Sequence, residues 1–412
     1  MKVNTEQVLS DSHLDAQSTT NQRQLSIAIA AVPEQVDQNL PLNLCLVLDR
    51  SGSMRGRPLE NIKEAAINLL EKLTPRDRLS VVTFNHEPRV LIPNQFVTDI
   101  VKIKNKIKQL RADGGTAIDE GMKLGIKQLA DGKQDTVSQI FLLTDGENEH
   151  GNNERCLKLA LLASEYNITL NTLGFGNHWN QDVLEQISDS ANGSLSYIEA
   201  PEQAVDQFGR LFTRMQSVGL INAYLNLELM PQVRLAELKP VAQVAPETIE
   251  LPIKEEGGVF TVRLGDLIIN TPRIVLANLY ISKLPPGTHP IAKVQIRYDD
   301  PAHSQQNLLS EKMSVEVEVQ EIYQANPVES VQKSILTLAK YRQTKIAETK
   351  LEQGDRLGAA SMFESAANTA LQLGDKSAAT VLQVSATRLQ SGEELSEAER
   401  KKTRIVSKTT LQ

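Results

Sequence analysis

Cysteine is scarce in this sequence. Cys45 and Cys156 are the two examples among 412 residues, the first in an apolar run and the second in a segment of helical character. Two cysteines cannot supply the disulfide framework on which small secreted domains depend. We therefore expect both to be apolar core residues of a protein in a reducing compartment.

Long apolar segments are also missing. No run of about 18 uncharged apolar residues occurs, although a membrane-spanning helix needs that length. Residues 1–24 contain no apolar stretch of the kind that forms the centre of a secretory signal peptide. These features predict a cytoplasmic, soluble protein without a membrane span.

Positive charge is not concentrated in any part of the chain. The formal net charge is −7, aromatic residues make up 4%, and no dense Lys/Arg run is interleaved with aromatics. Proteins that bind nucleic acid carry such basic patches because phosphate contacts supply much of their affinity. We therefore expect no nucleic-acid partner.

What the chain does contain is enough apolar sequence, 40% of its residues, for two or three domains. Between residues 40 and 217, short apolar runs alternate with segments of helical period, which is typical of a parallel sheet with helices on both faces. We expect a doubly wound, mostly parallel α/β domain over residues 39–217. Its expected strands are Leu42–Leu48, Leu79–Phe84, Gln139–Thr144, Thr169–Phe175 and Leu195–Ile198, with an additional short antiparallel edge at Val90–Ile92.

After residue 218 the apolar residues alternate with period 2. Runs such as Val259–Leu264 and Ile291–Tyr298 are separated by turns that contain Pro and Gly, so we expect an antiparallel β-sandwich over residues 218–327. Gln24–Val32 alternates in the same way although it precedes the α/β domain. We expect residues 1–38 to add strands to the sandwich, with a loose N-terminal strand as the alternative.

From residue 328 the pattern is helical again. A five-residue motif at 351–355 recurs at 371–375, near the ends of what resemble the helices of one tetratricopeptide-like unit. One unit is too short for a stable solenoid, so we expect residues 328–391 to form a small helical domain that packs on the sandwich. The charged residues 392–412 are expected to form a polar, mobile tail.

Side chains that can bind a hard cation follow two of the expected strands. Asp49, Ser51 and Ser53 lie on a tight loop after the first strand, and Asp145 follows a later strand. Thr116 comes after two glycines, where a helical segment begins. Because ligands of an open α/β sheet bind beyond the carboxyl ends of its strands, sheet topology can bring these three loops to one edge.

These five side chains offer two carboxylates and three hydroxyls. An oxygen-only set on a tight loop suits Mg²⁺, which keeps octahedral coordination and several waters, and Mn²⁺ fits the same set. Ca²⁺ is a further alternative, although it prefers more ligands. The lack of Cys and His in the set disfavours zinc.

The Asp-x-Ser-x-Ser loop, followed by the distant Thr116 and Asp145, resembles the metal-ion-dependent adhesion site of the von Willebrand factor A family. All five positions match. The resemblance implies that Asp49, Ser51, Ser53, Thr116 and Asp145 hold a divalent cation directly or through water. It also implies that the cation accepts an Asp or Glu carboxylate from a partner protein.

The same resemblance implies further properties. The arrangement is that of a bacterial-type member in which the von Willebrand factor A domain is inserted in a β-sandwich. Relatives of this type often work beside AAA+ ATPases. Family members can also couple capture to a movement of the last helix of the domain, here Glu202–Ser217.

Each of the candidate ligands has an ordinary structural interpretation as well. Asp49 could cap the following helix, Ser51 and Ser53 could be turn residues, and Thr116 could be a helix N-cap. Their order and their placement at strand ends together favour the metal site. Phosphate binding by the two glycines is disfavoured because no G-x-x-x-x-G-K-[ST] run occurs.

Two other functions stay open at this point. A Mg²⁺-dependent phosphohydrolase uses a strand-end Asp as nucleophile, but haloacid-dehalogenase-type enzymes need a second Asp where this chain has Ser51. No G-x-S-x-G elbow is present either. The other alternative is a scaffold in which the metal only stabilises the α/β domain. We expect a protein–protein interaction module that is not an enzyme.

Other residues fall on or beside the same loops. Trp179, the single tryptophan, is expected to pack rather than to recognise a partner. The remaining residues could influence partner choice, although most of them are expected to be solvated loop surface: Arg50, Met54, Arg55, Asp119, Glu147, Asn148, His150 and His178.

Overall fold

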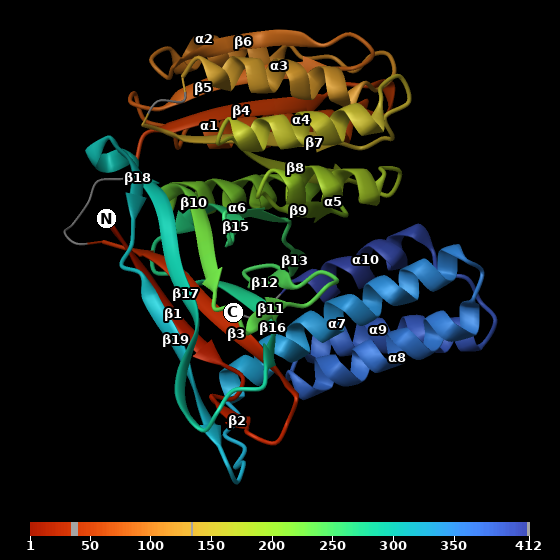
Figure 1. Cartoon of the computed structure of the whole chain (residues 1–412). Helices are drawn as coiled ribbons and strands as arrows, with labels where there is room; N and C mark the ends of the chain where they lie inside the picture. The colour runs from red at the N-terminus through yellow and green to blue at the C-terminus, as the bar shows by residue number, and fades with distance from the viewer. Residues whose placement is uncertain (34–39, 133–134, 410–412) are drawn as a thin grey trace.

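The computed structural model describes residues 1–33, 40–132 and 135–409. It consists of an α/β domain, a β-sandwich beneath it, and a helical domain beside both (Figure 1). The predicted boundary between residues 38 and 39 lies outside the described residues. Among the residues that are described, none of the helices has the length and apolar character needed to span a membrane.

The α/β domain is built on one sheet with the strand order β6-β5-β4-β7-β8-β9. β4 pairs in parallel with β5 and with β7, and β6 is the antiparallel edge. The doubly wound fold is therefore confirmed, and the edge is longer than Val90–Ile92. The strands are β4 (Leu42–Asp49), β5 (Arg78–Phe84), β6 (Arg89–Phe96), β7 (Val137–Thr144), β8 (Thr169–Phe175) and β9 (Leu195–Ile198).

Helices cover both faces of this sheet. Leu44 and Leu46 of β4 belong to the apolar core under α1 and α6, whereas Cys45 and Val47 face the core under α3, α4 and α5. Successive strand residues point to opposite faces, so a strand buried on both sides is apolar throughout. The helices are α1 (Arg57–Leu70), α2 (Ile100–Lys108), α3 (Ile118–Ala130), α4 (Asn153–Glu165), α5 (Gln181–Ser190) and α6 (Ala204–Gln216), with short 3₁₀ turns η1 (Gly52–Met54) and η2 (Pro201–Gln203).

The β-sandwich combines strands from before and after the α/β domain. β3 contains the segment Gln24–Val32 and pairs antiparallel with both β1 and β16. One sheet holds β1 (Lys2–Leu9), β3 (Thr20–Val32), β11 (Val233–Leu235), β12 (Val241–Ala245), β13 (Ile249–Glu250) and β16 (Arg273–Ser282). The other holds β2 (His13–Asp15), β10 (Val218–Leu229), β14 (Ile253–Glu256), β15 (Val259–Ile268), β17 (Gly287–Asp300), β18 (Gln305–Leu309) and β19 (Met313–Gln320), with the turn η3 (Pro301–His303) after β17.

The helical domain contains α7 (Glu329–Glu352), α8 (Arg356–Gln372), α9 (Lys376–Gln390) and α10 (Glu397–Lys408). The repeated five-residue motif marks the two connections between its long helices. Gly354 and Gly374 take φ values of 80° and 77°, the left-handed conformation that ends a helix. Asp355 and Asp375 then cap α8 and α9 by accepting hydrogen bonds from Gly358 N (2.8 Å) and Ala378 N (3.0 Å).

The prediction of a mobile polar tail over residues 392–412 is wrong for the described part of that range, because α10 forms there. Ser396 and Glu399 make a capping box at its start. Its cations Lys401, Arg404 and Lys408 are buried. Arg404 and Lys408 face carboxylates of α7 and α5, and Lys401 donates a hydrogen bond to Asn177 O. The buried face of α10 consists of charged and polar residues, so the sequence shows no apolar stripe that would mark it as packed.

Ion pairs fasten α10 and α7 to α5 of the α/β domain. Lys408 Nζ of α10 lies 2.5 Å from Asp189 Oδ1 of α5, and Lys345 Nζ of α7 lies 3.4 Å from Glu185 Oε1 of α5. Burial disfavours the charged form of Glu185, but Lys408, Lys345 and Arg404 outweigh that effect and lower its pKa. The helical domain thus lies against the α/β domain as well as on the sandwich.

The first prediction concerns the two thiols. Burial raises the pKa of Cys45 and of Cys156 to about 12, and the reactive species of cysteine is the thiolate. At pH 8 we expect neither thiol to react with Ellman's reagent in the folded protein, and both to react after unfolding in guanidinium chloride. The absorbance of the released thiolate measures this, and fast reaction of the folded protein would show that a cysteine is accessible.

Candidate metal site at the edge of the sheet

The two candidate carboxylates lie at the same edge of the α/β sheet. β4 and β7 are neighbouring parallel strands, with Leu48 opposite Leu143. Asp49 is the last residue of β4, and Asp145 directly follows β7. Thr116 lies two residues before α3, on the second of the three loops at this edge, and Asp145 lies on the third. The segments that were expected to converge do so.

Backbone hydrogen bonds hold the three loops together. Gly52 N donates to Gly114 O, and Asp113 N donates to Arg50 O, each at 2.8 Å. His150 N donates to Thr116 O at 2.9 Å and so ties the second loop to the third. The relative positions of the loops are therefore fixed by main-chain atoms.

The side chains of the first and third loops touch. Ser53 Oγ donates to Asp145 Oδ1 at 2.7 Å, and Ser51 Oγ lies 3.0 Å from Ser53 Oγ and 3.5 Å from the same carboxylate oxygen. The Thr116 hydroxyl is beside them, since a Cβ atom on Gly146 would lie 3.5 Å from Thr116 Oγ1. Four hydroxyl or carboxylate groups thus share a small volume.

Asp49 lies beneath this cluster with its carboxylate fully buried. Its Oδ1 accepts a hydrogen bond from Ser51 N at 2.7 Å, and its Oδ2 accepts one from Thr144 Oγ1 at 2.6 Å. Burial raises the pKa of Asp49 to about 6, and the two hydrogen bonds only partly offset that rise. Burial also raises the pKa of Asp145.

The residues present fit a hard divalent cation. Two carboxylates in partly or fully buried positions lie near one another, and Asp145 adds to the cost of ionising Asp49. Serine and threonine hydroxyls supply neutral oxygens, and no sulfur or imidazole belongs to the set. A cation among these oxygens would relieve the repulsion between the carboxylates.

Neither Asp49 nor Thr116 acts as a helix cap. The N-cap residue of α1 is Gly56, so Asp49 does not cap that helix. The N-cap residue of α3 is Ala117, which makes no side-chain capping hydrogen bond. Instead, Asn148 Oδ1 accepts a hydrogen bond from Ile118 N at 2.7 Å.

Sequence reasoning did not reveal the structural roles of three residues at this edge. Thr144 donates a hydrogen bond to the Asp49 carboxylate, and Asn148 on the third loop accepts one from the first residue of α3. Asn85 Nδ2 donates to Asp113 O at 2.8 Å. Asn85 directly follows β5, so the rule that singled out Asp49 and Asp145 after their strands would also have found it. The expected solvated positions of Met54 and Asp119 are wrong, because both side chains are buried.

Trp179 packs as expected. It is buried, and its indole Nε1 donates to Gly176 O at 2.7 Å. A Cβ atom on Gly174 would lie 2.2 Å from the indole ring, so only glycine leaves room for the ring at that position of β8.

Comparison with known proteins agrees with this architecture. The family model described as von Willebrand factor type A domain matches residues 43–210, and the model described as Sll0103-like, C-terminal alpha-helical domain matches residues 329–412. The two matches identify a von Willebrand factor type A domain and a separate C-terminal helical domain in this chain. The uncharacterized protein sll0103 of Synechocystis sp. is 60% identical over 412 residues, which cover 100% of this chain and 98% of that protein. The chain belongs to the family of that protein.

More distant relatives share only parts or only the fold. Inter-alpha-trypsin inhibitor heavy chain H2 of Mus musculus is 29% identical over 209 residues, which cover 47% of this chain and 22% of that protein. A solved structure titled von Willebrand factor type A from Catenulispora acidiphila superposes with a TM-score of 0.82 at 15% identity, covering 99% of this chain and 97% of that one. Domains of this type typically mediate protein–protein interactions.

The second prediction tests the hydrogen bond that Thr144 donates to the Asp49 carboxylate. Thr144→Val keeps the side-chain shape but removes the hydroxyl that donates to a fully buried carboxylate, so the free energy of unfolding should fall by about 1–3 kcal/mol. Urea denaturation measures the loss. The matched control is Thr288→Val, at an exposed position of β17, which should change stability by less than about 0.5 kcal/mol. Equal effects of the two substitutions would show that the Thr144 hydroxyl does not stabilise the site.

Proposed function

We propose that this protein is a metal-dependent interaction module that captures an acidic side chain of a partner protein. The observation that carries the proposal is the meeting of Ser51, Ser53 and Asp145 side chains within 3.5 Å, above the buried Asp49. Thr116 completes the set from the loop that main-chain hydrogen bonds hold beside them.

Each residue has a distinct task in this proposal. Ser51, Ser53 and Thr116 would hold Mg²⁺ by their hydroxyl oxygens, while Asp49 and Asp145 would bind it or orient its waters. Mn²⁺ and Ca²⁺ are alternatives with the same type of ligand. When bound, the cation offers a coordination position that a carboxylate from outside can fill. Ser53 is exposed, so the cluster is open to such a carboxylate on that side.

The phosphohydrolase alternative is less favoured by the same geometry. A nucleophilic Asp needs a free oxygen that can reach the substrate. Both oxygens of Asp49 accept hydrogen bonds, and the side chain is fully buried. We propose that the protein is not an enzyme. A cytoplasmic location and an AAA+ ATPase partner also remain predictions.

The third prediction is that capture depends on the metal. In pull-downs with the full chain, we expect partner proteins to be retained in Mg²⁺ and lost in chelator. Ser53→Ala and Asp49→Ala should lose them in both conditions, because the first removes a ligand at the surface and the second a buried carboxylate. The matched control is Glu64→Ala, an exposed residue of α1 away from the edge, which should behave as wild type.

The alternatives give different outcomes in the same preparations. If neither chelation nor the substitutions change the captured set, the metal does not bridge the partner. If Asp145→Ala lowers the melting temperature but leaves capture intact, the metal is structural, as in the scaffold alternative. Phosphatase activity that requires Mg²⁺ and Asp49 would make the protein an enzyme.

A further inference from the structure

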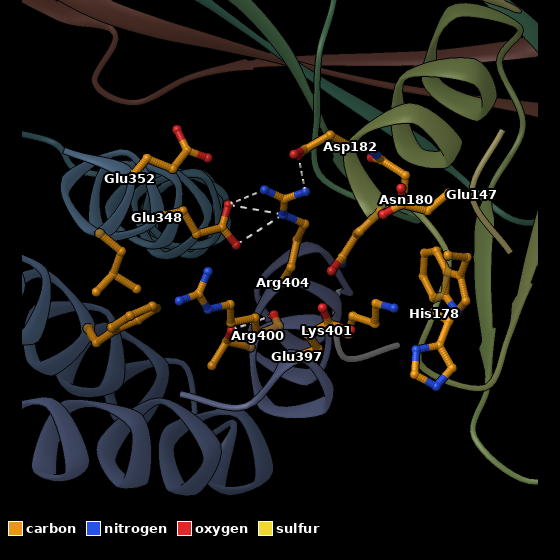
Figure 2. A pocket seen from close by; sticks show the side chains of 15 residues that line it. Glu147, His178, Asn180, Asp182, Glu348, Glu352, Glu397, Arg400, Lys401 and Arg404 are labelled. Carbon is orange, nitrogen blue, oxygen red and sulfur yellow. Dashed lines mark hydrogen bonds and ion pairs between the residues drawn. The ribbon is translucent and has the colours of Figure 1, made fainter. Parts of the chain in front are cut away.

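A pocket of about 430 Å³ lies between the α/β domain and the helical domain (Figure 2). Glu147, only two residues after Asp145, lines it from the α/β domain. His178 lines the same side and is close enough to the Asp145 carboxyl for the two charges to interact. A partner segment bound at the metal site can therefore extend into this pocket.

The pocket carries an excess of negative charge. Five carboxylates and three cationic side chains line it, so the negative charges exceed the positive ones by two. Three of the carboxylates, Glu147, Glu352 and Glu397, have no hydrogen bond or ion pair from their side chains among the described residues. The other two, Asp182 and Glu348, are both held by Arg404.

The wall of the pocket also suits a cation with an apolar stem. Leu351 and Phe363 line it from the helical domain, and Trp179 lines it from the α/β domain. Lys401 already places its Nζ 4.2 Å from the centre of the Trp179 ring and donates to Asn177 O. The protein's own lysine thus shows how this wall accommodates an ammonium group.

We infer that the pocket binds a lysine or arginine side chain of the partner whose acidic residue is captured at the metal site. The acidic half of this motif rests on the proposed function, whereas the pocket and its charge do not. The apolar wall would contact the aliphatic stem, and Glu352 and Glu397 would pair with the cationic group. The partner would be recognised by an acidic and a basic residue at a fixed separation.

The test uses peptides of defined sequence rather than an unknown partner. Nine-residue peptides carry a central Glu in a Gly/Ser background and one Arg, Lys, Leu or Glu at each other position in turn. With the full chain in Mg²⁺, we expect Arg and Lys at one or two positions to bind about 10-fold more tightly than Leu or Glu at the same position. Peptides that bind in Mg²⁺ but show no such preference at any position would overturn the inference.

Variants of the pocket sharpen the result. The double substitution Glu352→Gln and Glu397→Gln changes two exposed side chains and should remove the preference for Arg and Lys while peptides with Glu alone still bind. The matched control is Glu364→Gln, an exposed residue of α8 that does not line the pocket. Arg400→Ala should keep or strengthen the preference, because Arg400 is a cation of the pocket. If the wild type instead prefers Glu at that position, and Arg400→Ala loses this preference, the pocket binds acidic side chains and the inference is wrong.

A second measurement separates the pocket from the metal. Trp179 is the only tryptophan, so its fluorescence reports on this pocket alone. Titration with N-acetyl-arginine methylamide in chelator should give a saturable change in wild type and a weaker one in the double variant. If this change occurs but no peptide binds in Mg²⁺, the proposed metal-dependent capture fails and the pocket inference stands. If peptides bind in Mg²⁺ without a charge preference and the fluorescence does not respond, the pocket inference fails and the capture stands.

Discussion

The carboxylate of Asp49 is a negative charge placed at the end of a strand that is buried on both sides. Such a group costs several kcal/mol to bury unless hydrogen bonds or an opposite charge compensate it. Thr144 and the Ser51 amide supply two hydrogen bonds, but the pKa of Asp49 still rises to about 6. In the proposed function, a divalent cation held by the neighbouring oxygens would supply the missing compensation.

The rest of the domain keeps these oxygens in place. Parallel pairing of β4 with β7 aligns two strand ends, and main-chain hydrogen bonds from Gly52, Asp113 and His150 join the loops. The helical domain lies beside the same part of the α/β domain, because buried ion pairs such as Lys408 with Asp189 join α10 to α5. This contact between domains forms the acidic pocket, which Glu147 lines two residues after Asp145 of the candidate metal site (Figure 2).

Much of this arrangement follows from the sequence, and the reasons are local. Apolar strands such as Leu42–Leu48 are recognisable because both faces of the sheet need apolar residues, and the strand-end rule singled out Asp49 and Asp145. The position of α10 was not predictable in this way, since Lys401, Arg404 and Lys408 are buried by pairing with residues far away in the chain. For the same reason the pocket beside Trp179 could not be inferred. It forms from two domains whose contact is electrostatic and carries no periodic signal.

Direct binding of a divalent ion is the most decisive observation on the central claim. Mn²⁺ is paramagnetic, and its electron paramagnetic resonance signal in solution weakens when the ion binds protein. Titration of the full chain should show one Mn²⁺ bound per chain, displaced by excess Mg²⁺ and absent in Asp145→Ala that retains its fold. Binding of Mn²⁺ with equal affinity by Asp145→Ala, or no binding by the wild type, would contradict the account.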